Sequence, residues 1–410
     1  MINVPEAKSL VIKHTKLLTP VEVSLWESRG LVLAQDVKSD MNIPPLTNSA
    51  MDGYAVRAED QKNASSDRPA MLELIGEVKA GEVFKGKVGK GQTVRIMTGA
   101  PLPKGADSVV RQEDTREEGR LVSIYVPVKK GDNVRYAGED IRKGEIVARK
   151  GEVLTPALIG VVASAGPAKI KVYPRPIVVT FATGDEVVDA GIKPAPGQIR
   201  SSNSYTIYHQ MAQVGAIPMN LGIAKDTPKA IETKIKQAMK KAHIIVTSGG
   251  ISVGKYDYVE LALAKLGFKT IFYKVKQRPG QPMVFGKIGD ILVFALPGNP
   301  VSSMVCAIQY VRTAIRKMMG FTDLDLPEVE AELEEDIKLK EERTYFLRGI
   351  LRKEEGKFFV RTTGPQGSGI LKSMAKGNCL IVLPPTETKV RRGNKVRVQI
   401  YEETPWTVIT

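Results

Sequence analysis

The strongest constraint on the fold is a regular alternation of apolar strands and helical segments within residues 174–322. Continuous apolar runs at 177–181, 244–247 and 291–295 are each followed by a loop of small or polar residues. This alternation is typical of a doubly wound α/β domain built on a parallel sheet. Ligands bind such sheets at the carboxyl ends of the strands, so the loops that follow these runs are the first candidates for a functional site.

Capping signals and strand patterns outline the rest of the chain. Threonine followed by proline at 19–20 and at 155–156 predicts helices over 19–28 and 156–164. Short alternating runs from 69 to 128 predict a small β domain, and the residues from Pro327 onward predict a β-rich C-terminal domain of about 85 residues. Further helices are expected over 204–214, 227–240 and 257–265, and from Pro300 to about 319.

The chain has 410 residues and a formal net charge of +15, which suggests an anionic partner. Nucleic acid, an anionic membrane and a phosphate-bearing small molecule are all compatible with that charge. The basic stretch 389–397 alternates with valines and has few aromatic neighbours. That pattern favours the solvated face of a strand over a platform for single-stranded nucleic acid.

Cysteine and histidine usage narrows the class of protein. Cys306 and Cys379 are far apart in the sequence, which excludes a disulfide framework and a cysteine zinc site. The three histidines do not have metal-ligand spacing. The chain shows neither a signal-peptide pattern nor an apolar run near the roughly 18 residues of a membrane span. We therefore expect a soluble, cytoplasmic protein.

Two of the strand-end loops carry groups that suit a phosphate or a cation. Residues 248–254 are rich in glycine, so their backbone N–H groups can approach a phosphate, although tight turns without a ligand use the same residues. Asp185 and Glu186 follow another apolar run, and hard cations prefer carboxylate oxygens. The same pair also fits the plain start of a turn or helix.

A basic loop and a serine suit an oxyanion. Lys274, Lys276, Arg278 and Gln281 bracket a Pro-Gly pair after a strand. A solvated basic turn is the alternative interpretation. Ser302 lies at an expected helix start, where the helix dipole favours an anion, but an ordinary N-cap explains it equally.

Several motifs taken together are more specific than any one of them. In chain order they are NSAMDGYA at 48–55, MTGA at 97–100, GED at 138–140, TGDE at 183–186, SGGISVG at 248–254 and LPGNPVS at 296–302. With RG at 348–349 and GPQGS at 364–368, they closely resemble the molybdopterin molybdenumtransferase family, which includes microbial MoeA and the E-domain of gephyrin. The resemblance covers essentially the whole chain.

The resemblance implies a homodimer of four-part subunits. A split N-terminal domain would comprise 1–43 and 137–173, with a β-rich inserted domain at 44–136. The doubly wound α/β domain at 174–322 would resemble molybdopterin adenylyltransferase, and a C-terminal β domain would cover 323–410. This partition agrees with the changes of pattern along the chain.

The reaction implied by the resemblance is insertion of molybdate into adenylylated molybdopterin, with release of AMP and a requirement for Mg²⁺. Carboxylates would hold the metal, and cations and N–H donors would hold phosphate and molybdate. Tungstate has the same charge and nearly the same shape, so a tungsten preference stays open.

The family's motifs carry residue roles over to two sets of positions. The catalytic set is Asp52, Thr98, Asp140, Glu186, Asp226 and Asp257, with Glu186 and Asp257 as metal ligands. The set that binds nucleotide, pterin and molybdate is Asn203, Ser248, Gly249, Gly250, Ser252, Gly254, Lys274, Arg278, Pro297, Gly298, Asn299, Ser302, Arg348 and Ser368. Asp52 and Asp140 are expected to face the α/β domain of the other subunit, which implies a site shared between subunits.

One position departs from the family pattern. Gln281 stands where several family members carry a lysine, and a neutral amide hydrogen-bonds without supplying charge. We therefore expect weaker molybdate capture or an altered choice of oxyanion.

The interpretation we favour has small anionic substrates, with neither nucleic acid nor a membrane as partner, and a molybdopterin adenylyltransferase as a candidate protein partner. Three alternatives are an adenylylation enzyme, a receptor-binding scaffold like gephyrin's E-domain, and a nucleic-acid-binding protein. The last would show a steep dependence of affinity on salt.

Overall fold

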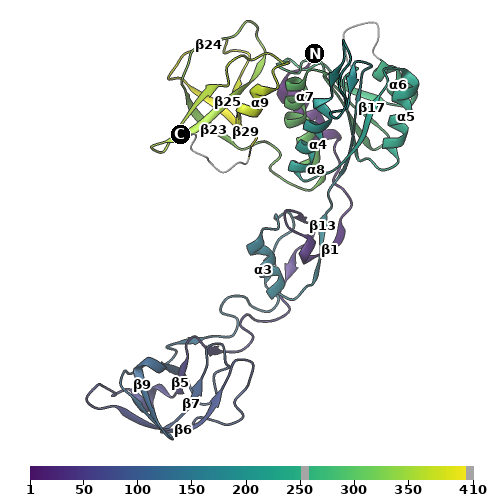
Figure 1. Ribbon diagram of the computed structural model, residues 1–410. Helices are drawn as coiled ribbons and strands as arrows, with labels where there is room; N and C mark the ends of the chain where they lie inside the picture. The colour runs from purple at the N-terminus through teal and green to yellow at the C-terminus, as the bar shows by residue number, and fades with distance from the viewer. Residues whose placement is uncertain (251–257, 403–410) are drawn as a thin grey trace. The chain divides into compact units, whose positions relative to one another are not determined.

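The computed structural model describes residues 1–250 and 258–402, and the chain divides into two compact units (Figure 1). Unit 1 comprises Met1–Val21, Gly30–Ala34 and Val172–Thr410. Unit 2 comprises Glu22–Arg29 and Gln35–Lys171. Among the described residues, no helix is both long enough and apolar enough to cross a membrane.

Unit 1 contains a six-stranded sheet in which the strands run, from edge to edge, β17, β14, β18, β22, β21 and β19. Their bounds in that order are Ile217–Ala224, Ile177–Thr183, Ile244–Ser248, Ile291–Leu296, Val284–Ile288 and Lys269–Tyr273. β17, β14, β18 and β22 are parallel. β21, which the sequence pattern did not predict, is antiparallel to both of its neighbours, and a two-residue turn joins it to β22. The doubly wound α/β prediction is confirmed, with one reversed strand.

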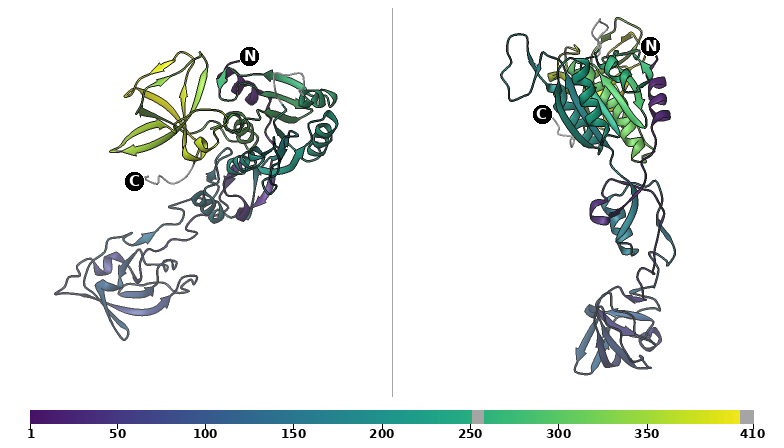
Figure 2. Two further views of the ribbon diagram at one scale, coloured as in Figure 1. Left: turned by 45° about the horizontal axis from the view of Figure 1, so that its top comes forward. Right: turned by 90° about the vertical axis from the view of Figure 1, so that its right-hand side faces the viewer.

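Helices cover both faces of this sheet (Figures 1 and 2). α5 (Pro228–Met239) and α6 (Tyr258–Lys265) pack on one face, where Phe181, Ile235 and Leu263 belong to one buried cluster. α4 (Ser202–Val214) and α7 (Pro300–Cys306) lie on the other face. After β14 the chain forms β17, which pairs with one edge of β14, and then β18, which pairs with the other edge. The carboxyl ends of β14 and β18 therefore flank the switch point where such sheets bind ligands.

The first helix of the chain is α1 (Val4–His14), which contacts α8 (Arg312–Met318) in unit 1. Asn3 caps it by accepting a hydrogen bond from the backbone N–H of Glu6 at 2.8 Å. The helix predicted over 19–28 is wrong, because that segment forms strand β1 (Val21–Ser24) and a short 3₁₀ turn. Its valines suit a strand, and pairing with β13 (Lys169–Tyr173) overrides the capping signal.

The C-terminal part of unit 1 is rich in β-strands, as the sequence pattern predicted, and its strands form a closed structure. The strand order β25, β26, β23, β29, β27 closes because β27 also pairs with β25. The bounds in that order are Thr344–Glu354, Lys357–Thr362, Glu328–Leu333, Lys395–Ile400 and Cys379–Leu383. Short strands β24 (Ile337–Lys338) and β28 (Lys389–Val390) form a separate pair, and α9 spans Lys372–Lys376.

The basic residues of β29 lie on the solvated side of that barrel. Lys395 and Arg397 pair with Glu330 and Glu328 at 2.7 and 3.6 Å, whereas Val396 is buried. The expectation of a solvated strand face at 389–397 is confirmed for β29.

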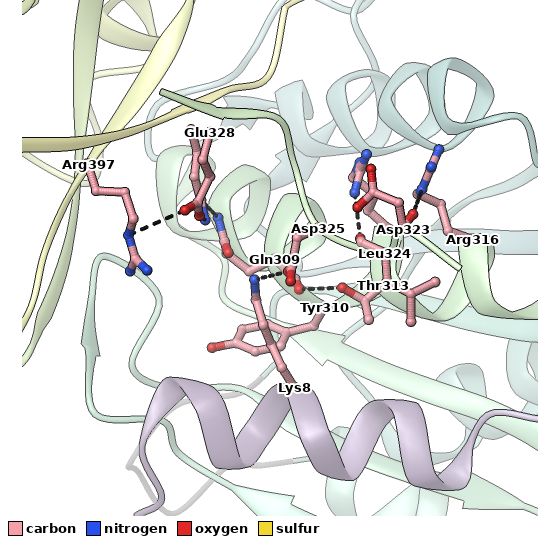
Figure 3. Close-up of polar contacts among 12 residues, drawn as sticks. Lys8, Gln309, Tyr310, Thr313, Arg316, Asp323, Leu324, Asp325, Glu328 and Arg397 are labelled. Atoms are coloured by element: carbon pink, nitrogen blue, oxygen red, sulfur yellow. Dashed lines mark hydrogen bonds and ion pairs between the residues drawn. The ribbon is translucent and has the colours of Figure 1, made fainter. Parts of the chain in front are cut away.

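A π-helical turn, Ala307–Val311, joins α7 to α8 and connects the sheet domain to the barrel within unit 1 (Figure 3). Gln309 donates through Nε2 to Gln399 Oε1 at 2.7 Å, and Gln399 donates to Glu328 Oε1 at 2.7 Å. Tyr310, next along the turn, donates to Gln277 in β20 (Gln277–Arg278), and β20 pairs with β25. The predicted helix from Pro300 to about 319 is therefore correct in extent but contains a π turn, a feature often found near functional sites.

Unit 2 contains a six-stranded sheet with strand order β8, β5, β7, β6, β10, β9. The bounds in that order are Ser108–Arg111, Gly53–Val56, Gln92–Ile96, Ala70–Val78, Leu121–Ile124 and Thr115–Glu118. Two buried clusters, one around Tyr54 and one around Val94, pack on it. Smaller elements are α2 (Ala58–Gln61), α3 (Pro156–Ser164) and the pairs β4 (Asn48–Ser49) with β11 (Val134–Arg135) and β3 (Val37–Lys38) with β12 (Ile146–Ala148). The predicted helix at 156–164 and the small β domain predicted from 69 to 128 are confirmed.

Two leucines on α6 test this packing. Leu263 is 1% exposed and belongs to the sheet core, whereas Leu261 is 55% exposed on the same helix. Leu263→Ala should destabilise unit 1 by about 2–5 kcal/mol, and Leu261→Ala by no more than about 0.5 kcal/mol. Calorimetric unfolding of the two variants measures both values. Equal destabilisation would contradict the assignment of the α6 core face.

Candidate active site

Polar side chains meet at the carboxyl ends of β14 and β17. Thr183 donates through Oγ1 to Asp226 Oδ1 at 3.1 Å, and the backbone N–H of Asp226 donates to Asp185 Oδ1 at 3.1 Å. The carboxylate of Glu186 folds over Gly184, where a Cβ atom would lie 2.6 Å from it. The loop predicted from the TGDE motif is therefore compact, and it brings three carboxylates to one edge of the sheet.

The loops after β18 and β22 approach each other closely. A Cβ atom on Gly249 would lie 2.5 Å from the carbonyl oxygen of Thr183, and Gly249 has a φ of +88°. A Cβ atom on Gly298 would lie 3.7 Å from the Cα of Gly249. Because a side chain at 249 would strike the backbone, this position requires glycine. The predicted residues Ser248, Gly249 and Gly250 thus lie beside the loop that carries Pro297, Gly298 and Asn299.

Asn203, at the start of α4, completes this edge. Its Nδ2 donates to the carbonyl oxygen of Gly298 at 2.9 Å, and the residue is 8% exposed. Its Oδ1 is buried and has no hydrogen-bond partner among the described residues. Buried acceptors are normally satisfied, so this oxygen suits a donor supplied by a bound molecule. We refer to the edge formed by Asn203, 183–186, 248–250 and 297–299 as the strand-end cradle.

A cavity of about 380 Å³ borders the 297–299 loop. Predicted residues Arg278, Pro297, Asn299, Ser302 and Ser368 line it. Ser302 is 4% exposed, and the carbonyl oxygen of Ser368 accepts from the backbone N–H of Val301 at 3.1 Å. The structure therefore brings together one arginine and two serines that come from three separate segments of the chain. We call this space the basic cavity.

The basic cavity also has lining residues that sequence reasoning missed, namely Glu341, Arg343 and Gln366. Arg278 pairs with Glu341 at 3.2 Å, and Arg343 pairs with the same carboxylate. The Nη1 of Arg343 donates to Gln281 Oε1 at 2.6 Å. Spacing could not have revealed this contact, because 62 residues separate the partners. A cation thus lies beside Gln281, where the sequence predicted a loss of charge.

Arg348 is placed differently from its prediction as a direct ligand. It is 0% exposed, and its guanidinium donates to Ser373 Oγ at 3.0 Å and to the carbonyl oxygen of Gly367 at 3.1 Å. Its backbone N–H donates to Gln366 Oε1 at 2.9 Å. Burial lowers the pKa of this guanidinium to about 10. Arg348 therefore holds the 366–368 loop that lines the basic cavity and does not line the cavity itself.

Lys274 also lies outside the lining of the basic cavity. Its Nζ packs over the ring of Tyr273 at 4.8 Å, and its backbone has a φ of +63°. The backbone N–H of Ile2 donates to the carbonyl oxygen of Lys274 at 3.2 Å, which holds the N-terminus at this segment.

Three predicted catalytic residues belong to unit 2. Asp52 Oδ1 accepts from the backbone N–H and from Oγ1 of Thr98, at 2.6 and 2.7 Å. The Thr98 N–H, followed by its hydroxyl, lowers the pKa of the Asp52 carboxyl. Asp140 is exposed, and its backbone N–H donates to the carbonyl oxygen of Ile43 at 3.1 Å. The structure thus joins Asp52 to Thr98 as a pair.

Ser252, Gly254 and Asp257 lie outside the described residues. The described part of the chain has no group of three or more His, Cys, Asp or Glu that could hold a metal ion. Mg²⁺ is, however, usually held by one or two carboxylates together with substrate phosphates. The carboxylates of Glu186 and Asp185 in the strand-end cradle, with that of Asp226 in contact with it, supply donors of that chemistry.

Comparison with known proteins defines the class. The MoeA N-terminal region (domain I and II) matches residues 2–166, a probable molybdopterin binding domain matches 179–317, and the MoeA C-terminal region (domain IV) matches 330–401. Together these matches assign the chain to the MoeA class of proteins, and its α/β sheet domain matches a probable molybdopterin binding domain.

Relatives specify the family. The molybdopterin molybdenumtransferase of Nostoc is 38% identical over 92% of this chain and 87% of its own length. That of Bacillus subtilis is 34% identical over 100% of this chain and 97% of its own length. The crystal structure of the molybdopterin biosynthesis MoeA protein of Pyrococcus horikoshii matches with a TM-score of 0.84 and 29% identity, covering 98% of this chain and 99% of that one. The chain therefore belongs to the molybdopterin molybdenumtransferase family, whose members are enzymes of molybdenum cofactor biosynthesis.

The Asp52–Thr98 pair gives a test by titration. Because its folded pKa is depressed, ionised Asp52 favours the folded state above its unfolded pKa of about 3.9, and this contribution is lost as the pH falls. Thr98→Ala removes the hydroxyl donor and leaves the N–H, so the pKa should rise part of the way back. Carboxyl NMR titration measures it. An unchanged pKa in Thr98→Ala would contradict a role for the hydroxyl.

Proposed function

We propose that this protein inserts molybdate into adenylylated molybdopterin and releases AMP, in a reaction that depends on Mg²⁺. The observation that carries the proposal is the position of the 297–299 loop. Gly298 accepts a hydrogen bond from Asn203 within the strand-end cradle, and Pro297 and Asn299 also line the basic cavity. A nucleotide and an oxyanion bound in these two places would be neighbours, as the reaction requires.

In this proposal the strand-end cradle holds the nucleotide. The backbone N–H groups of the 248–250 loop meet phosphate oxygens, as glycine-rich loops at strand ends do. Asn203 presents its Oδ1, which has no hydrogen-bond partner within residues 1–250 and 258–402, to a donor on the nucleotide or the pterin. Ser252 and Gly254 extend the same loop in sequence.

The basic cavity holds molybdate. Arg278 supplies positive charge, and Ser302 and Ser368 supply hydroxyl donors for the oxyanion's oxygens. Arg348 positions the 366–368 loop through its hydrogen bond to the carbonyl oxygen of Gly367. Lys274 contributes to the general positive field rather than to direct contact.

Glu186 and Asp257 are the proposed Mg²⁺ ligands, with Asp226 held nearby by Thr183. A bound Mg²⁺ would neutralise phosphate charge as AMP leaves. Asp185 accepts a hydrogen bond from the backbone N–H of Asp226 and so joins the loops that follow β14 and β17.

We further propose a cytoplasmic homodimer with four domains per subunit, divided as the resemblance implies. Asp52, Thr98 and Asp140 would then complete the site of the partner subunit. A molybdopterin adenylyltransferase would supply the adenylylated substrate, and tungstate would be a competing oxyanion.

Release of AMP tests the proposal. With adenylylated molybdopterin, molybdate and Mg²⁺, the wild-type protein should release AMP, and Glu186→Ala should lower the rate by about 100-fold or more. Asp290→Ala is the matched control, because that exposed carboxylate lies at the opposite end of the sheet, in the turn before β22. Its rate should equal that of the wild type. Absence of AMP release by the wild-type protein with every divalent metal tried would refute the proposed reaction.

A further inference from the structure

A chain of charged and hydrogen-bonded side chains crosses the sheet of unit 2 beside the Asp52–Thr98 pair. The hydroxyl of Tyr54 on β5 donates to Glu117 Oε2, and Nη1 of Arg95 on β7 lies 3.5 Å from the same oxygen. Tyr54 stands directly opposite Arg95 in the antiparallel pairing of β5 with β7. Glu117 belongs to β9, which forms the far edge of the sheet and pairs only with β10. Its carboxylate therefore joins β9 to two strands with which β9 does not pair.

Tyr54 is the fixed member of this chain. It is 4% exposed, and burial, followed by the hydrogen bond to Glu117, raises the pKa of its phenol to about 12, so the hydroxyl stays a donor at neutral pH. The side chains of Arg95 and Glu117 are 40% and 31% exposed, and both line a cavity of about 470 Å³. The buried phenol thus fixes Glu117, and Glu117 in turn fixes the guanidinium of Arg95.

The same strand pairing places Arg95 close to Asp52. Asp52 precedes Tyr54 by two residues, so both side chains belong to the face of the sheet on which Tyr54 meets Arg95. Asp52 is then the diagonal neighbour of Arg95, at a separation that a long side chain spans. The N–H and the hydroxyl of Thr98 lower the pKa of the Asp52 carboxyl most, and the positive charge of Arg95 lowers it further.

The other charged groups around Arg95 come from the neighbouring strands. Arg111 on β8 pairs with Asp114 at 2.9 Å. Glu77 on β6 stands opposite Arg95 and lines the same cavity. The charged lining of the cavity also includes Glu73 and Arg120. Because Arg111 has a carboxylate of its own, Arg95 is the arginine whose charge is divided between Asp52 and the carboxylates of the cavity.

We propose that Arg95 is a positioning residue for Asp52: Tyr54 and Glu117 hold its guanidinium in place, and its charge orients the Asp52 carboxylate for the two hydrogen bonds from Thr98. The inference rests on the proposed function, in which Asp52 is a catalytic residue that completes the site of the partner subunit. An exposed carboxylate that acts on a substrate bound elsewhere must be ordered in advance, and supporting side chains supply that order.

Carboxyl NMR titration of Asp52 in the full chain tests the placement of Arg95. Arg95→Gln removes the positive charge and should raise the pKa of Asp52. Glu117→Gln removes the carboxylate that competes for this charge and should lower it. Structural damage alone would weaken the bonds from Thr98 and raise the pKa in both variants. Shifts of opposite sign are therefore the expected result, and shifts of the same sign, or an unchanged pKa in Arg95→Gln, would overturn the inference.

Arg116→Gln is the matched control for loss of an arginine from the same sheet. Arg116 lies on β9, where its 70% exposed side chain pairs with Glu118 at 2.8 Å. It does not line the cavity. The pKa of Asp52 should be the same in Arg116→Gln as in the wild type, because exposed ion pairs have little effect beyond their own members.

AMP release tests the consequence for the reaction. Arg95→Gln should lower kcat by about 10- to 100-fold, with KM for molybdate unchanged, because a misplaced catalytic group slows the chemical step. Arg95→Lys keeps the charge and should recover most of the rate, and Arg116→Gln should match the wild type. A wild-type rate in Arg95→Gln would overturn the inference and leave the proposed function intact. Wild-type protein that releases no AMP would instead contradict the proposed function, while the titration of Asp52 would still decide the placement of Arg95.

Discussion

The close approach of two backbone loops, at Gly249 and Gly298, is the constraint on which the proposed site depends. The parallel strands β18 and β22 lie side by side, so their carboxyl ends bring these loops together. The absence of a side chain at 249 lets the loop lie against Thr183, and Asn203 fixes Gly298 from the start of α4. One short loop then serves as the wall of the basic cavity and as part of the strand-end cradle.

The π-helical turn Ala307–Val311 links the sheet domain to the barrel through hydrogen bonds. Tyr310 reaches Gln277, and Gln277 donates to the carbonyl oxygen of Pro279 at 2.9 Å. Gln309, one residue earlier, reaches Gln399 on β29. Two successive side chains of the π-helical turn therefore bond to two different partners, Gln277 beside the Pro-Gly loop and Gln399 of the barrel. The Pro-Gly loop and the barrel both surround the basic cavity, so the geometry of the cavity depends on buried hydrogen bonds that must remain satisfied.

The sequence predicted those parts of the site that depend on local chain geometry. Gly249 and Gly298 follow apolar strands, and glycines at the ends of such runs can be recognised from the sequence alone. Arg343 and Glu341 could not be predicted, because they reach the cavity only after β25 pairs with β20. Arg348 was assigned a ligand role from its motif, and the structure buries it with a hydrogen bond to the carbonyl oxygen of Gly367, a contact that the motif did not predict. The helix expected at 19–28 failed for a related reason, since pairing of β1 with β13 outweighed a local cap.

The fold shows that part of the chain's positive charge is paired with carboxylates and is therefore less available to an anionic partner. Basic residues on β29 are paired with acidic residues of β23, so the basic residues of this strand are not a free cationic surface.

The most direct test of the account is a crystal structure with molybdate and AMP bound together. The account predicts the anomalous signal of molybdenum in the cavity of Arg278, Ser302 and Ser368, with the AMP phosphate at the 248–250 loop. Molybdenum bound elsewhere, or AMP bound away from that loop, would contradict it.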